Sequence, residues 1–242
     1  MTRSSETTIV DPDRALRAEF SPYVPLMAFL AEILGPRAEI VLHDTSDLSR
    51  SIVALTNGHI SGRSVGGPAT DLVLKVLQNH EQDDRDFLAN YLAESRAGGR
   101  FRSSTYFIRD ARMKVIGMIC VNIDDEHLTR ARDLLTTIIA TTGVVKGGAP
   151  GDILVQPEGP RPVAERLSMN VDELALDGVA RIVAAQGQDP QRMTPDEKIA
   201  AVRELERAGM FLLKGAVTQV AEALYVSEPT VYRYVKQVRR DE

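Results

Sequence analysis

The sequence predicts an α+β protein in two parts: an antiparallel sheet with helices, followed by an all-α helix-turn-helix domain. Three observations lead to this prediction. Between about residues 20 and 145, short β-branched runs and helical segments occur without the regular alternation of a parallel sheet. A Gly- and Pro-rich stretch begins at Lys146, and short amphipathic segments follow residue 191. The 242 residues therefore divide into a flexible tail (1–19), a sheet domain (20–145), a linker with one helix (146–190) and a helical domain (191–242).

The first part of the sheet domain contains one helix and two strands. A helix is expected over 20–34, with Ser21 as its N-cap and Gly35-Pro36 as its end. The runs 39–43 and 51–55 are typical of strands, because Val and Ile suit a pleated surface and turn residues separate the runs.

The second part is predicted to complete the sheet. Short helices are expected over 70–78 and 86–95, and strands over 100–109 and 114–123. The last strand is apolar on both parities, which indicates a sheet covered on both faces. The second cover could be the N-terminal helix, the long helix described next or another subunit.

A long amphipathic helix is expected after the last strand. Asp124 or Asp125 can cap its start, and Gly143 suits its end. An apolar stripe with helical spacing runs along it: Leu128, Ala131, Leu134, Leu135, Ile138 and Ile139.

The C-terminal domain carries the sharpest pattern. Thr194 to Glu197 form a capping box, which starts the first of three short amphipathic helices. The second and third helices are joined by a tight turn, and Ser227 suits the N-cap of the third. This arrangement is typical of a helix-turn-helix.

The third helix has an apolar stripe centred between Val231 and Val238 and a cationic face opposite to it. That face offers guanidinium, ammonium and hydroxyl groups and no carboxylate, so it suits base edges and phosphates. In helix-turn-helix docking the N-terminal half of this helix reaches the bases, which favours Thr230 and Arg233. The predicted DNA-binding residues are Thr218, Ser227, Pro229, Thr230, Tyr232, Arg233, Lys236 and Arg240. The alternative is that these cations only form the solvent-exposed face of the helix and bind nothing.

The distribution of charge supports DNA binding. The whole chain has a formal net charge of -5, but residues 1–190 carry -6 and residues 191–242 carry +1. The acidity therefore belongs to the sheet domain, and a small basic domain is attached to it.

Composition and motifs exclude several other classes. The single Cys, the absence of a secretion signal and the lack of an apolar stretch of about 20 residues predict a cytoplasmic protein without a membrane partner. No metal-binding spacing, P-loop or dinucleotide fingerprint occurs, so no cofactor, metal or catalytic residue is expected. The sequence therefore predicts a protein that is not an enzyme.

Polar residues within or beside the apolar strands predict a small-molecule pocket. His43 and Asp44 end the first strand, where the alternative is that they cap the following turn. A buried amide or hydroxyl needs a partner, which can be backbone, water or ligand. Cys120 lies in an apolar strand, and a buried structural thiol is the favoured interpretation of it. The predicted ligand-binding set is His43, Asp44, Asn57, Asp71, Ser103, Ser104, Cys120 and Asn122, and the Gly-rich segment 62–68 is expected to form a flexible wall or lid.

Between Tyr23 and Arg239, apart from the linker, the chain resembles the YheO-like PAS–helix-turn-helix regulators. The most specific segments are 39–44, 57–63, 102–108, 116–122, 219–224 and 227–234. The resemblance implies a PAS-like sensor, a DNA-binding helix-turn-helix and, as one option, repression of amino-acid (D-arginine-like) catabolism. The breaker-rich segment 147–162 departs from the family pattern.

The resulting hypothesis is a ligand-responsive transcriptional regulator. Its expected partners are double-stranded operator DNA, a small-molecule effector such as an amino acid, and a second copy in a homodimer or a higher homo-oligomer. One alternative is a metabolite-binding or enzymatic PAS-like domain with a helical C-terminal module that binds protein. Another is a structural adaptor with a self-filled core.

Overall fold

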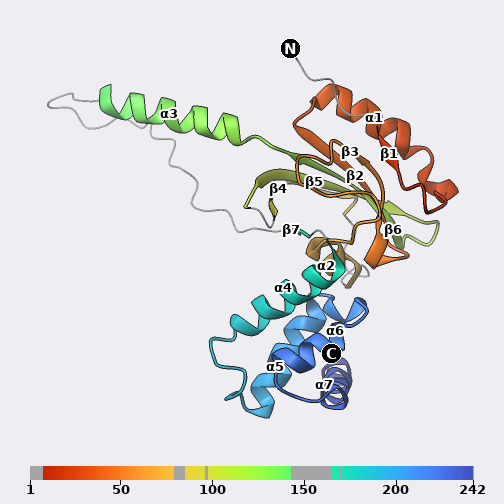
Figure 1. The fold of residues 1–242 in the computed structure, drawn as a ribbon, viewed down its shortest axis with the longest axis vertical. Helices are drawn as coiled ribbons and strands as arrows, with labels where there is room; N and C mark the ends of the chain where they lie inside the picture. The colour runs from red at the N-terminus through yellow and green to blue at the C-terminus, as the bar shows by residue number, and fades with distance from the viewer. Residues whose placement is uncertain (1–7, 79–84, 96–97, 143–164, 169, 242) are drawn as a thin grey trace.

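A seven-stranded sheet forms the N-terminal part, with the strand order β1-β3-β2-β6-β5-β4-β7 (Figure 1). The computed structural model describes residues 8–78, 85–95, 98–142, 165–168 and 170–241. All neighbouring strands are antiparallel except β4 and β7, which are parallel. The strands are β1 (Ile9–Val10), β2 (Ala38–Asp44), β3 (Ile52–Thr56), β4 (Phe87–Ser95), β5 (Arg100–Arg109), β6 (Val115–Ile123) and β7 (Glu165–Leu167). The α+β prediction with a mainly antiparallel sheet is confirmed.

One helix packs on each face of this sheet. On the outer face, α1 (Tyr23–Leu34) buries Met27 and Ala31 against alternate residues of β2 and β6. On the inner face, α2 (Asp71–Gln78) packs on the opposite parity of the same strands. The prediction that both faces are covered is therefore confirmed. Pro22, not Ser21, precedes α1, and its side chain makes no capping hydrogen bond.

Residues 86–95, predicted as a helix, form strand β4, so this prediction was wrong. The register with β5 shifts between Leu88 and Tyr91, and Asn90 has a left-handed φ of 59°. Such a bulge inserts an extra residue and interrupts the alternation of apolar side chains. The apolar residues of this segment consequently follow a spacing that imitates a helix.

Part of the expected linker is built into the two domains. β7 lies within it and pairs with β4, and α4 (Val171–Ala184) packs into the C-terminal core (Figure 1). The Asn170 side chain caps α4 by accepting a hydrogen bond of 2.8 Å from the Glu173 backbone N–H. Residues 143–164, which include the Gly- and Pro-rich part of the expected linker, lie outside the described residues.

The C-terminal helices form the predicted helix-turn-helix. They are α5 (Pro195–Arg207), α6 (Ala216–Ala223) and α7 (Glu228–Asp241), and a short 3-10 helix, Met210–Leu212, joins α5 to α6. The Thr194–Glu197 capping box is present at the start of α5. A single core unites α4 to α7 with Leu74 of α2. Gly209, at φ 71°, approaches α2 so closely that an added Cβ would lie 2.6 Å from the Leu74 carbonyl oxygen.

The long helix α3 (Glu126–Thr142) leaves the end of β6 and projects away from the sheet (Figure 1). Every side chain described on it, from residue 126 to residue 138, is exposed. Over the described ranges, no helix is long and apolar enough to cross a membrane.

Candidate functional site

Helix α7 presents two opposite faces. Val231, Tyr234, Val235 and Val238 are buried in the C-terminal core. The opposite side exposes the predicted DNA-binding residues of this helix, with Thr230 half-buried: Pro229, Thr230, Tyr232, Arg233, Lys236 and Arg240. The Arg233 guanidinium lies 5.5 Å from the Tyr234 ring centroid, which orients it by a cation–π contact.

The turn before α7 is ordered by side chains. Thr218 on α6 donates a hydrogen bond of 2.7 Å to Glu228, and the Ser227 and Thr230 hydroxyls lie 2.9 Å apart. Tyr225 takes a left-handed φ of 52° between the two helices. Two of the predicted DNA-binding residues, Thr218 and Ser227, are thus also parts of the turn that fixes the direction of α7.

Arg239 differs from its cationic neighbours on α7. Its Nε donates a hydrogen bond of 2.7 Å to Glu206 Oε1 on α5, and the Glu206 side chain is only 6% exposed. This pair attaches the end of α7 to α5, so Arg239 has a structural partner while Arg233 and Lys236 face solvent.

The inner face of the sheet holds a buried network around Glu39. Arg63 Nη2 and Asn122 Nδ2 each donate to Glu39 Oε2 over 2.7 Å, and Ser61 donates to Oε1. Ser103 completes the chain by donating to Asn122 Oδ1 over 2.7 Å. Burial alone would lower the pKa of Arg63, but the charge and hydrogen bond of Glu39 raise it overall, so Arg63 is cationic.

A second buried network on the same face surrounds Glu165 of β7. Thr70 donates to Glu165 Oε1 over 2.7 Å, and Tyr91 donates to Oε2 over 2.8 Å. The Tyr91 hydroxyl also lies 2.7 Å from the hydroxyl of Thr105, which lies 3.1 Å from the Cys120 sulfur. Burial raises the pKa of Glu165, and the Thr70 hydrogen bond and the charge of Arg63 offset this in part. Burial also raises the pKa of Cys120 to about 12, so its thiol is protonated and unreactive.

Two buried nitrogens of this face have no hydrogen-bond partner among the described residues: Arg63 Nη1 and His43 Nε2. The other ring nitrogen of His43 lies 2.8 Å from the Ser51 hydroxyl. Burial, and secondly the charge of Arg63, lower the pKa of His43 to about 3, so the imidazole is neutral. A buried polar group without a partner costs roughly 1–3 kcal/mol, so each of these two nitrogens calls for a partner such as a water molecule or a ligand.

The structure brings together only part of the predicted ligand-binding set. The four that share the inner face are His43, Ser103, Cys120 and Asn122. Asp44 pairs with Arg14 over 2.6 Å and caps the turn by accepting from the Ser46 backbone, while Asn57 donates to the Ala38 carbonyl over 2.8 Å.

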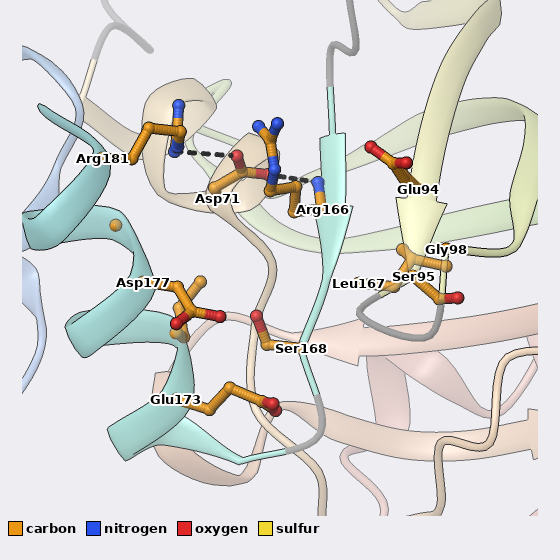
Figure 2. Close-up of a pocket in the computed structure, with 12 residues that line it drawn as sticks. Asp71, Glu94, Ser95, Gly98, Arg166, Leu167, Ser168, Glu173, Asp177 and Arg181 are labelled. Atoms are coloured by element: carbon orange, nitrogen blue, oxygen red, sulfur yellow. Dashed lines mark hydrogen bonds and ion pairs between the residues drawn. The ribbon is translucent and has the colours of Figure 1, made fainter. Parts of the chain in front are cut away.

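The other two predicted residues lie at different places. Ser104 has the opposite parity from Ser103 and lines a groove of about 400 Å³ on the outer face. Asp71 begins α2 and lines a pocket of about 250 Å³ at the junction of the two domains. Figure 2 shows its carboxylate between the Arg166 backbone N–H, at 2.7 Å, and the Arg181 side chain, at 3.4 Å.

Sequence reasoning missed the charged centre of the inner face. Glu39 gave a usable signal, because a carboxylate inside an otherwise apolar strand needs a buried partner. Arg63 was placed in a flexible wall or lid, but its side chain is 1% exposed and ion-paired with Glu39 over 2.7 Å. Glu165 gave no local signal, since it follows a breaker-rich segment.

Comparison with known proteins identifies both domains. Residues 14–140 match the YheO-like PAS domain, and residues 177–236 match an HTH domain. The chain is 28% identical to the uncharacterized protein YheO of Escherichia coli K12 over 90% of this chain and 83% of that protein. An uncharacterized protein of Haemophilus influenzae is 27% identical over the full length of both chains.

A relative with a named role also aligns. The transcriptional regulator DauR of Pseudomonas aeruginosa is 23% identical over 87% of this chain and 90% of its own length. The sheet domain, the helix-turn-helix and these similarities agree with one another along the chain. The chain therefore belongs to the family of YheO-like PAS-domain regulators with a C-terminal DNA-binding helix-turn-helix.

Proposed function

We propose that this transcriptional regulator binds operator DNA through α7 under the control of a small molecule bound by its PAS-like domain. The observation that carries the DNA-binding part is the face of α7 on which Arg233, Lys236 and Arg240 are exposed opposite a fully buried apolar stripe. Such a face can enter the major groove, because it carries no carboxylate that would repel the phosphates.

The residues of this face divide by their position on the helix. Thr230 and Arg233 lie in its N-terminal half, which supports contacts with base edges, where Arg pairs bidentately with guanine. Lys236 and Arg240 lie further along, which supports contacts with phosphates. One such face reads one half-site, so we further propose that the protein binds DNA as a homodimer.

The effector is proposed to bind on the inner face of the sheet. The buried and unpaired Arg63 Nη1 supports a ligand with a carboxylate, because a guanidinium donates strong charge-assisted hydrogen bonds to that group. Glu165 lies in the field of Arg63, and its carboxyl oxygens supply hydrogen-bond acceptors for an ammonium group. An α-amino acid carries both groups, so an amino acid is the effector class we propose.

The route from effector to DNA is proposed to run through β7. Glu165 joins the inner face to this strand, and three residues separate the end of β7 from the start of α4 in the C-terminal core. An effector that competes for Glu165 would weaken the bonds from Thr70 and Tyr91 and change the position of α4. The effector then shifts DNA affinity by its preference for one state, and DNA shifts effector affinity equally.

The regulated process is proposed to be amino-acid catabolism, D-arginine-like substrates included, with the protein as its repressor. The family resemblance supports this choice. If the protein represses catabolic genes, the effector should release it from DNA. An effector that strengthens DNA binding would contradict this mode of regulation.

A titration of labelled DNA from the region upstream of its own gene tests the DNA-binding part. Fluorescence anisotropy should show selective binding over a scrambled duplex of equal length, with an affinity that falls as salt rises. Equal affinity for both duplexes, or no binding with any amino acid present, would instead favour a helical module that binds protein.

Calorimetry with free amino acids tests the effector part. Each active amino acid is compared with its carboxamide, which keeps the side chain and ammonium but lacks the carboxylate. The carboxamide should bind at least tenfold more weakly if Arg63 answers the carboxylate. Equal affinity of acid and amide would contradict this site and leave DNA binding untouched. Failure of every amino acid to bind, with intact DNA binding, would contradict the proposed effector class.

A further inference from the structure

Helix α3 is amphipathic, but nothing in the described structure covers its apolar side. Leu128, Leu134, Leu135 and Ile138 form a stripe along one face, and each is between 59% and 66% exposed. The stripe extends over about 15 Å at 1.5 Å per residue. An isolated helix of 17 residues is marginal in water, because most helical stability comes from packing of the apolar face.

A second exposed apolar surface lies on the outer face of the sheet, beside the part that α1 covers. The groove of about 400 Å³ runs between α1 and strands β4 to β6, and it is lined by Tyr23, Leu26, Leu30, Phe87, Tyr106 and Ile119 among others. Two of these side chains are strongly exposed, Phe87 at 59% and Tyr106 at 47%.

The same surface continues along α1. Phe29 and Ile33 are 60% and 63% exposed beside the groove-lining residues Leu26 and Leu30. A monomer rarely exposes two apolar surfaces of this kind, and a contiguous exposed patch marks an interaction site. One surface is a protruding ridge and the other is a hollow, so they are complementary in shape.

We propose that α3 of each protomer packs into the outer-face groove of a second copy of this chain. α3 does not reach its own groove, because it leaves the sheet at the end of β6 and points outward (Figure 1). A reciprocal exchange closes after two copies, since the same two surfaces meet on both sides of a two-fold axis. This inference specifies the homodimer of the proposed function and rests on it only for the need of two DNA-reading helices.

Sedimentation velocity over a range of concentrations tests the exchange. The stripe is disrupted by Leu135→Glu and the groove by Tyr106→Glu, and each should weaken dimerisation at least tenfold. Leu176→Glu on α4 is the matched control, because Leu176 is 58% exposed but lies on neither surface. Circular dichroism should show that Leu135→Glu keeps the sheet and the C-terminal helices, with any loss of helical signal confined to the amount that α3 contributes, because Leu135 is exposed within its own chain. A wild-type monomer, or a dimer insensitive to both changes, would overturn the proposal.

Cross-linking shows which surfaces meet. The native Cys120 is buried, so Leu135→Cys and Tyr106→Cys each carry one accessible thiol. A mixture of the two variants treated with a short bis-maleimide should give a covalent heterodimer in higher yield than either variant alone. Homodimers of Leu135→Cys as the main product would show α3 packed against α3 and overturn the exchange. A double variant cross-linked within one monomer would show that the groove is filled in the same chain, which also overturns it.

These measurements are independent of the proposed function. They are made without DNA or effector. If the dimer forms through α3 but the protein does not bind operator DNA, only the proposed regulatory function is contradicted. A dimer formed elsewhere with intact operator binding would contradict the α3 exchange alone.

Discussion

Tyr91 on β4 donates a hydrogen bond of 2.8 Å to Glu165 on β7, and this bond connects the sensor interior to the segment that enters the C-terminal domain. Thr70, next to the first residue of α2, donates to the other oxygen of the same carboxylate. Thr70 and Glu165 are buried and Tyr91 is partly buried, so a change at this site would affect β7 and α4, which follows it in the chain.

The first prediction concerns the pH dependence of stability at Glu165. Its pKa is raised by burial in the folded state, so the folded state favours the protonated form. The stabilising contribution is therefore complete below the unfolded pKa of about 4.5 and is lost as pH rises through the raised folded pKa. In Glu165→Gln, urea unfolding should show less decline of stability on the alkaline side than in the wild type. Glu222→Gln, at an exposed position of α6, is the control. If the unfolding free energies of the wild type and Glu165→Gln depend on pH in the same way, the raised pKa of Glu165 is contradicted.

The second prediction concerns His43 on the acid side. Its folded pKa of about 3 lies below the ordinary value of 6.5, because burial and the charge of Arg63 oppose protonation. Stability is therefore lost as pH falls below about 6.5, by up to about 1.4 kcal/mol per pH unit. His43→Asn can keep a hydrogen bond to Ser51 without gaining a charge, so its unfolding free energy should fall less steeply between pH 6 and pH 4. An unchanged slope would exclude His43 as the source.

The local sequence pattern was sufficient to predict helix α7 but not strand β4. On α7 the apolar spacing, the turn and the opposed cations all follow one helical period, and the structure buries the predicted stripe. On β4 the left-handed Asn90 shifts the alternation, and no local pattern reports a bulge that is decided by pairing with β5.

The buried networks depended on contacts that are distant in sequence. Glu165 meets Thr70 across 95 positions, so only the completed sheet brings these two residues together. Glu39 was visible as a carboxylate in an apolar strand, but its partner Arg63 lies in a Gly-rich loop whose path local pattern does not determine. The apolar stripe of α3 could be predicted from the sequence, but the surface that covers it could not. Amphipathicity predicts that one face of a helix is buried and does not identify what it packs against.

The third prediction concerns the strained residue in the helix-turn-helix turn. Tyr225 holds a left-handed φ of 52° although its side chain is 61% exposed. The left-handed conformation costs roughly 1–2 kcal/mol for a residue with a Cβ, and glycine adopts it freely. Tyr225→Gly should therefore stabilise the protein by about 0.5–1 kcal/mol in chemical denaturation. Tyr225→Ala keeps the Cβ and should give no such gain; a gain of equal size would attribute the effect to the lost side chain.

The fourth prediction separates structure from DNA contact on α7. Arg239→Ala removes the partner of the buried Glu206, so the unfolding free energy should fall by about 1 kcal/mol, a value discounted because Arg239 itself is half exposed. Sequence selectivity should not change in the folded protein. Arg240→Ala, at the next position with an 80% exposed side chain, should give the reverse: unaltered stability and weaker binding to any duplex. Loss of operator selectivity in Arg239→Ala would move this residue into the reading face.

The fifth prediction is that Arg233→Ala weakens binding to the operator by roughly tenfold to a hundredfold, the equivalent of about 1–3 kcal/mol for one bidentate base contact. Binding to a scrambled duplex should change far less, because Arg233 lies in the N-terminal half of α7, which we propose contacts base edges. The control is Arg192→Ala, which removes the same charge from the exposed loop before α5. Anisotropy titrations at two salt concentrations separate the possible roles. Equal losses on operator and scrambled duplexes, with a smaller salt dependence than wild type, would make Arg233 a phosphate contact and leave Thr230 as the base-reading residue.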